Sequence, residues 1–180
     1  MKLAEHYDFL HIVTADLIRE EISTRTERAF RLARLMSQGQ LVPTDILVEL
    51  MITKILNNRL NKHGVVVSGF PRRKEQSILF DRFVRPPHLV LYLDVRDSVL
   101  SDRIMGRSIT TREVVVMNYE DIKSQLKEFH TRTRPIVKHY KDCLVQVDGE
   151  ADPVSVFEAA CEAVDRFLQK LDTSSSVISR

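Results

Sequence analysis

The sequence has 180 residues, of which 43% are hydrophobic and 29% are charged. This length and composition suit one globular domain, which at this size buries roughly 70% of the surface of its unfolded chain. The net charge of +2 argues against a nucleic-acid-binding protein, and no apolar run reaches the length of about 18 residues that a membrane span needs. Two cysteines, Cys143 and Cys161, indicate buried reduced thiols and favour a cytoplasmic location.

Strand-like and helix-like patterns alternate along the chain. Runs of apolar and β-branched residues predict four strands. Two of these runs, Gly64–Val67 and His88–Asp94, predict buried strands. Because strands that alternate with helices favour a parallel sheet covered on both faces, we predict a three-layer α/β fold. The predicted strands lie near residues 10–13, 65–67, 88–94 and 143–147, and the predicted helices near residues 1–9, 17–22, 27–37, 44–63, 74–84, 98–105, 118–140 and 152–171.

Several positions mark where these elements begin or end. Thr14–Asp16 offers N-cap chemistry for the second helix, and Gly39 is expected to end the third helix at its C′ position. Pro135 is expected to interrupt the long polar helix. The stretch from Gly106 to Val116 is expected to form a loop, and the polar residues 172–180 are expected to form a disordered tail.

The stretch Ser68–Gln76 directly follows the predicted strand at Val65–Val67. In open α/β sheets, ligands bind just past the carboxyl ends of the strands. Arg72 is therefore placed where its planar guanidinium can bind a phosphate. Gln76 lies one helical turn later and can offer a donor and an acceptor to a base. Taken alone, the stretch also fits a solvated basic loop.

Four further motifs accompany this stretch in a fixed order: Thr14–Arg19, Gly39–Pro43, Asp102–Arg107 and Thr110–Arg112. In this order and with these gaps, the set resembles the nucleoside monophosphate kinases, namely adenylate kinase and UMP-CMP kinase. The similarity covers residues 3–171. Each motif is weak alone, and together they are specific.

The resemblance implies a P-loop-kinase-like domain over residues 1–171, with a monophosphate-binding arm at about residues 14–43 and a short lid at about residues 106–117. It implies transfer of a phosphoryl group from ATP to AMP or a similar nucleoside monophosphate, with Mg²⁺ as the cofactor. The lid contains no cysteines for a structural zinc. No nucleic-acid or membrane partner is expected.

The resemblance also assigns roles to single residues. Arg19 and Arg72 are expected to clamp the acceptor phosphate, and the amide of Gln76 is expected to hold the base, with adenine as the base that suits glutamine. The residues that it places at the monophosphate are Thr14, Arg19, Gly39, Val42, Gly69, Arg72 and Gln76. The residues that it places on the ATP side are Arg103 and Arg107, and those to which it gives a catalytic role are Arg107 and Arg112. It assigns no metal ligand.

Four departures from the family pattern affect the expected activity. The 180 residues contain no Gly-x-x-x-x-Gly-Lys phosphate loop, which in the family supplies a backbone cradle and a lysine for the ATP phosphates. Ser68 replaces an acidic residue that would organise Mg²⁺-bound waters. Val114–Val116 follows Glu113 where the family has two aspartates, and Gln125 stands where it has an arginine. The acceptor half of the site is therefore expected to be retained and the donor half to be degraded.

The phosphate loop normally follows the central strand of the sheet, so that strand is expected to be missing here. Each buried unpaired backbone group costs about 1–3 kcal/mol, a large share of a net stability of about 5–15 kcal/mol. The flanking strands could close onto each other, or a partner chain could supply a strand. We favour a third alternative, a truncated form of a longer enzyme, because Met1 falls inside the family's first helix.

The expected function is therefore that of a nucleoside monophosphate kinase whose present chain has little activity. The alternative is a catalytically inactive module that binds a monophosphate or serves as a scaffold. The sequence leaves open which monophosphate binds and what the oligomeric state is.

Overall fold

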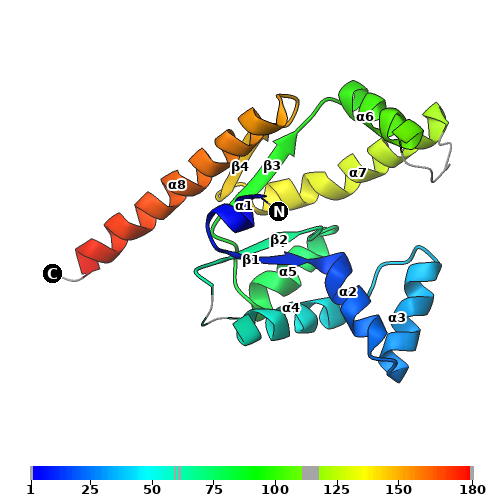
Figure 1. Ribbon diagram of the computed structural model, residues 1–180, viewed down its shortest axis with the longest axis horizontal. Helices are drawn as coiled ribbons and strands as arrows, with labels where there is room; N and C mark the ends of the chain where they lie inside the picture. The colour runs from blue at the N-terminus through cyan, green and yellow to red at the C-terminus, as the bar shows by residue number, and fades with distance from the viewer. Residues whose placement is uncertain (1, 59, 61, 111–117, 179–180) are drawn as a thin grey trace. The chain divides into compact units, whose positions relative to one another are not determined.

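The computed structural model describes residues 2–58, 60, 62–110 and 118–178. These residues divide into two units, Met1–Pro86 (unit 1) and Pro87–Arg180 (unit 2). Each unit holds its own two-stranded parallel sheet and its own helices (Figure 1). Parallel strands joined through helices confirm the predicted α/β class. The extent of the kinase domain, residues 1–171, stays a prediction.

Unit 1 is built on strands β1 and β2, which pair in parallel with Leu10 opposite Val65 and Val13 opposite Ser68. Because parallel strands end at the same edge of a sheet, the segments that follow β1 and β2 emerge side by side. One of these segments is helix α2, and the other is the loop that leads into α5. The elements of unit 1 are α1 (Lys2–His6), β1 (Leu10–Val13), α2 (Thr14–Ser23), α3 (Glu27–Ser37), α4 (Thr44–Asn58), β2 (Val65–Ser68) and α5 (Lys74–Phe83).

The core of unit 1 joins α2 and α4 to the sheet. Ile12 on β1, Leu17 on α2, and Leu47 and Met51 on α4 form a buried cluster, and Ile12 and Met51 are almost fully shielded from solvent. Burial of side chains of this size stabilises the fold by about 1.5–3 kcal/mol each. This core holds the beginning of α2 rigidly against the end of β1.

Helix α3 ends as the sequence predicts. Gly39 has a φ of +67°, and its N–H donates to the carbonyl of Met36 at 3.0 Å, while Gln40 N–H donates to the carbonyl of Leu35 at 2.9 Å. This pair of bonds is a Schellman motif with Gly39 at C′. The motif turns the chain sharply, so that residues 40–42 run back towards α2 and α4.

The beginning of α2 differs from the prediction. Thr14 is the first helical residue rather than the N-cap, and the N-cap position belongs to Val13, which makes no side-chain cap bond. The Thr14 hydroxyl donates instead to the carbonyl of Gly69 at 3.2 Å. A tertiary hydrogen bond therefore takes the hydroxyl that local sequence chemistry assigns to the helix end.

Unit 2 is built on strands β3 and β4, which pair in parallel with Val90 opposite Leu144 and Asp94 opposite Asp148. Helix α8 packs on β4, and α6 packs on α7. Its buried apolar side chains include Ile122, Ile136, Val147 and Val164. The elements of unit 2 are β3 (Val90–Asp94), α6 (Asp97–Thr110), α7 (Tyr119–His139), β4 (Leu144–Asp148) and α8 (Pro153–Ile178).

Helices α6 and α8 extend further than predicted, and helix α7 lacks the predicted interruption. Helix α6 continues to Thr110, so the first residues of the expected lid loop are helical, and residues 111–117 lie outside the described residues. Helix α7 passes through Pro135 without a break. Helix α8 continues to Ile178, which corrects the prediction of a disordered tail from residue 172. There the Thr173 hydroxyl donates to the carbonyls of Gln169 and Lys170, a local bond that a helix can retain.

The two strands that the sequence predicts to be buried, β2 and β3, are only partly buried. Val65 on β2 is 42% exposed and Leu93 on β3 is 54% exposed. Within the described strands, β2 pairs with β1 and β3 pairs with β4, so each has a hydrogen-bonded neighbour on one side. A strand of a parallel sheet is shielded fully only when neighbours and helices cover it. In the described parts of both units, no helix is long and apolar enough to cross a membrane.

Candidate functional site

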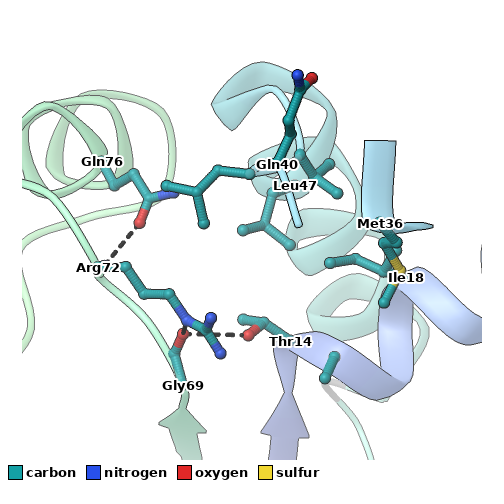
Figure 2. Close-up of a pocket in the computed structure, with 11 residues that line it drawn as sticks. Thr14, Ile18, Met36, Gln40, Leu47, Gly69, Arg72 and Gln76 are labelled. Carbon is teal, nitrogen blue, oxygen red and sulfur yellow. Dashed lines mark hydrogen bonds between the residues drawn. The ribbon is translucent and has the colours of Figure 1, made fainter. Parts of the chain in front are cut away.

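A pocket of about 110 Å³ opens in unit 1 beyond the carboxyl ends of β1 and β2. Its wall comes from the start of α2, the end of α3 and the following loop, the start of α4, and the segment from Gly69 to α5 (Figure 2). The position agrees with the rule that ligands of α/β sheets bind past the strand ends. The lining residues are Thr14, Ala15, Ile18, Met36, Gln40, Leu41, Val42, Leu47, Gly69, Arg72 and Gln76.

Gly69 connects the two strand ends at the base of the pocket. Its carbonyl oxygen accepts hydrogen bonds from the Thr14 hydroxyl at 3.2 Å and from Nε of Arg72 at 3.1 Å. Its φ is +77°, and an added Cβ would lie 3.0 Å from the Thr14 Oγ1. Both the backbone conformation and the close approach favour glycine at this position.

Arg72 and Gln76 form the polar side of the pocket. The backbone N–H of Arg72 donates to Oε1 of Gln76 at 2.7 Å, and Gln76 is only 4% exposed. The acceptor of the Gln76 amide is therefore used within the protein, and its NH₂ group stays available as a donor. Among the described residues, the terminal nitrogens of Arg72 have no protein partner, so the guanidinium retains donors for an anion.

The rest of the wall is largely apolar. Ile18, Met36 and Leu47 line it together with Val42, which is 6% exposed. Apolar side chains that surround a few convergent polar groups are typical of small-molecule sites. The sequence patterns single out none of Ile18, Met36 and Leu47 as residues of a pocket. Their helical spacing gives no sign that distinguishes a pocket wall from a core.

The structure brings together five of the seven residues predicted to bind the monophosphate: Thr14, Val42, Gly69, Arg72 and Gln76. Gly39 does not line the pocket, and it acts through the turn that places residues 40–42. Arg19 does not line it either, because its guanidinium pairs with Asp16 and its side chain is 60% exposed.

The residues predicted on the ATP side belong to unit 2. Arg103 on α6 donates to the carbonyl oxygens of Gly149 and Glu150, at 2.8 and 3.3 Å. Its guanidinium therefore holds the loop after β4. Arg107 lies on α6, and its side chain is outside the described part of the structure, as is the whole of Arg112. Their predicted roles stay predictions.

The end of β2 offers little to a magnesium ion. Ser68 Oγ lies 3.0 Å from Nε2 of His11, and burial lowers the pKa of the His11 imidazole. A neutral hydroxyl that is bonded to a neutral imidazole is a poor substitute for a carboxylate beside Mg²⁺. In the ranges that the structure describes, no three His, Cys, Asp or Glu side chains gather as metal ligands. Ser68 and His11 therefore do not supply the carboxylate that would organise Mg²⁺-bound waters at this strand end.

Comparison with known proteins agrees with the motifs and with the fold. The adenylate kinase family model matches residues 1–145. Adenylate kinase isoenzyme 1 of Gallus gallus is 30% identical over 167 residues, which cover 92% of this chain and 86% of the relative. The human isoenzyme 1 is 29% identical over 166 residues, which cover 91% of this chain and 85% of the relative.

Adenylate kinase isoenzyme 5 of Mus musculus is 31% identical over 166 residues, which cover 91% of this chain but only 29% of that relative. The chain thus spans most of isoenzyme 1 and less than a third of isoenzyme 5. The resemblance drawn from the five motifs is confirmed, and this chain belongs to the adenylate kinase family.

Proposed function

We propose that this chain binds AMP or a similar nucleoside monophosphate in the pocket of unit 1. The observation that carries the proposal is the convergence of Thr14, Gly69, Arg72 and Gln76 on one pocket from two segments far apart in the sequence. The nucleotide would occupy the place of the phosphate acceptor in the reaction of an adenylate kinase.

Arg72 is the group that we propose for the phosphate. Its Nε is anchored on the Gly69 carbonyl, so the terminal nitrogens face the pocket in a fixed plane (Figure 2). A guanidinium held in this way can bind two phosphate oxygens at once and neutralise their charge. Anchoring also lowers the side-chain entropy that binding would otherwise cost.

Gln76 is the group that we propose for the base. Since its Oε1 accepts from the Arg72 N–H, its NH₂ group would donate to an acceptor on the base edge, such as a ring nitrogen of adenine. The apolar wall formed by Ile18, Met36 and Val42 would cover the faces of the base.

Phosphoryl transfer from ATP with Mg²⁺ is the reaction that family membership suggests, and we propose that these 180 residues perform it slowly. Phosphoryl transfer depends on positioning and on neutralising charge. This sequence contains no phosphate loop, Ser68 offers no carboxylate, and Arg103 is engaged by backbone carbonyls. The acceptor side is the better preserved half of the site.

A second candidate is an inactive module that binds a monophosphate or acts as a scaffold in the cytoplasm, completed by a partner chain that supplies a strand. Ser68 and Gln125 favour it, because truncation of an active enzyme would not explain their replacement of an acid and an arginine. A partner strand would pair with the edge of β2 that lies away from β1, since within the described strands β1 is the hydrogen-bonded neighbour of β2.

Calorimetry with AMP tests the proposed function. We expect saturable binding by the 180-residue chain and a loss of at least about tenfold in affinity, or about 1.4 kcal/mol, for Arg72→Ala. The matched control is Arg73→Ala, since Arg73 is an exposed neighbour that does not line the pocket. Absence of binding by every monophosphate would favour the scaffold. A coupled assay for ADP that gives turnover near ~10 s⁻¹ would contradict the proposed low activity.

A further inference from the structure

Helix α3 contributes to one wall of the pocket, but few of its side chains are buried against the rest of unit 1. Its last turn supplies Met36, and the Schellman turn that follows positions Gln40–Val42. Only Ala29 and Leu32 on α3 are fully buried, whereas Phe30 is 67% exposed. The helix packs on α2. A helix with so small a buried face can tilt at little cost unless something else holds it.

Arg28, in the first turn of α3, joins this helix to both of its neighbours. Its Nε donates to Oε1 of Glu21 on α2 at 2.7 Å, and its Nη1 donates to Oε1 of Glu49 on α4 at 2.8 Å. The side chain of Glu21 is only 11% exposed, and that of Arg28 is 34% exposed. The hydrogen bond with Glu21, followed by that with Glu49, raises the pKa of the guanidinium above its usual range.

The Arg28–Glu21 pair differs from ordinary surface pairs, which contribute about 0–1 kcal/mol because solvent screens them. The Glu49 side chain is 59% exposed, so solvent screens the second pair more strongly. Glu21 is mostly shielded, and one planar group meets two carboxylates in fixed directions, which gives geometric specificity. Removing Arg28 would leave the Glu21 carboxylate without its partner in a poorly hydrated position.

We propose that Arg28 is a positioning residue for the base-binding wall of the pocket: by fixing α3 to α2 and α4, it sets where Met36 and Gln40–Val42 stand. The proposal rests on the proposed function, since it concerns the same pocket. It separates two parts of that pocket. The phosphate side, formed by Thr14, Gly69 and Arg72, comes from α2 and the loop after β2 and includes no residue of α3.

The test compares two probes on the full 180-residue chain, AMP and ribose 5-phosphate, which lacks the base. For Arg28→Met we expect the Kd for AMP to rise about threefold to tenfold, a change of about 0.7–1.4 kcal/mol. The Kd for ribose 5-phosphate, followed by the NMR shifts of the Gly69 and Arg72 amides, should stay within about twofold. Arg28→Lys, which retains the charge but not the planar fork, should recover part of the AMP affinity.

Lys54→Met is the matched control. Lys54 pairs with Glu20 at 3.0 Å, an ion pair that links α4 to α2 and involves no residue of α3, and we expect Lys54→Met to change neither Kd. If Arg28→Met unfolds because Glu21 is left unpaired, the double variant Glu21→Gln with Arg28→Met removes both charges and is tested in its place.

Each outcome decides the proposal. An AMP Kd in the Arg28 variants equal to that of the wild type overturns it, and so does an equal weakening of both probes, which is the result expected of a general structural role. If the wild-type chain binds neither probe, the proposed function fails and this inference fails with it. If the wild-type chain binds ribose 5-phosphate as tightly as AMP, the wall formed by Met36 and Gln40–Val42 contributes nothing to binding of the base. Only this inference is then overturned.

Discussion

The backbone N–H of Arg72 and the side-chain Oε1 of Gln76 are joined by a hydrogen bond of 2.7 Å. This bond joins the residue proposed to bind the phosphate directly to the residue proposed to bind the base, so a shift of one displaces the other. The bond also fixes the orientation of the Gln76 amide, because only its oxygen can accept from a backbone N–H. The chain therefore determines which end of the amide faces a ligand before any ligand binds.

Gln76→Met should test this bond, since methionine has a similar length and no polar end. We expect a loss of about 1 kcal/mol in the free energy of unfolding, because a hydrogen bond is lost, and a loss of about tenfold in AMP affinity. Hydrogen exchange at the Arg72 amide should become faster. Glu75→Met is the control, because Glu75 is the exposed neighbour on the same helix and does not line the pocket. Equal effects of the two variants would contradict a special role of Gln76.

Gly69→Ala should damage the pocket more than Gly39→Ala. Both glycines have positive φ, +77° and +67°, so alanine is strained by about 1 kcal/mol at either position. At Gly69 the new Cβ would also lie 3.0 Å from the Thr14 Oγ1, whereas at Gly39 it would meet nothing within 4 Å. Urea unfolding should show a loss for both variants, and calorimetry should show the larger loss of AMP affinity for Gly69→Ala. The idea fails if the two variants bind AMP equally.

Local chemistry accounts for what the sequence predicted well. Gly39 ends α3 because residues 35–40 alone can form the Schellman motif, and Arg72 lies past a strand because the apolar run Val65–Val67 precedes it. Such features depend on few neighbouring residues, so a pattern in the sequence is enough to indicate them.

Tertiary partners account for what the sequence could not indicate. The Thr14 hydroxyl donates a hydrogen bond to the carbonyl of Gly69, 55 residues away, rather than to the end of its own helix. Met36 and Leu47 share a pocket wall through the packing of α2, α3 and α4, and their periodicity predicts only an apolar face. The link of Arg28 to Glu49 likewise joins positions that no local pattern relates.

Glu150 should make unit 2 sensitive to acid. Hydrogen bonds from the Arg96 side chain, followed by one from the Arg96 backbone N–H, lower the pKa of the Glu150 carboxyl from 4.5 to about 2. A carboxyl whose pKa is lower in the folded state contributes stability above its unfolded pKa and loses it as the pH falls. The loss should therefore occur between about pH 4.5 and about pH 2.

Thermal unfolding of the wild type and of Glu150→Gln over this range provides the measurement. The midpoint should fall more steeply with acid in the wild type, because glutamine cannot titrate, and the two curves should converge towards the acid end. Since other carboxyls titrate in both proteins, only the difference between the curves reports on Glu150. Parallel curves would mean that the contact with Arg96 contributes nothing to the stability of unit 2.

Ser68→Asp should reverse the pH response of His11. In the present chain burial lowers the pKa of His11 below 6.5, so the neutral form is favoured, and its contribution to stability is lost as the pH falls through 6.5. A carboxylate in place of the Ser68 hydroxyl, which lies 3.0 Å from Nε2, would favour the imidazolium and raise the pKa. The contribution would then be complete below the unfolded pKa and lost as the pH rises through the folded one.

NMR titration of His11 in the wild type, Ser68→Asp and Ser68→Ala distinguishes charge from burial at the end of β2. Ser68→Ala should retain a lowered pKa, because burial rather than the hydroxyl is the main cause. Ser68→Asp should move the pKa above that of both other proteins, and stability to urea should rise rather than fall as the pH decreases from about 7 to about 6. An unchanged pKa in Ser68→Asp would show that the aspartate does not reach the imidazole, and that this edge of the sheet cannot regain its carboxylate by a single substitution.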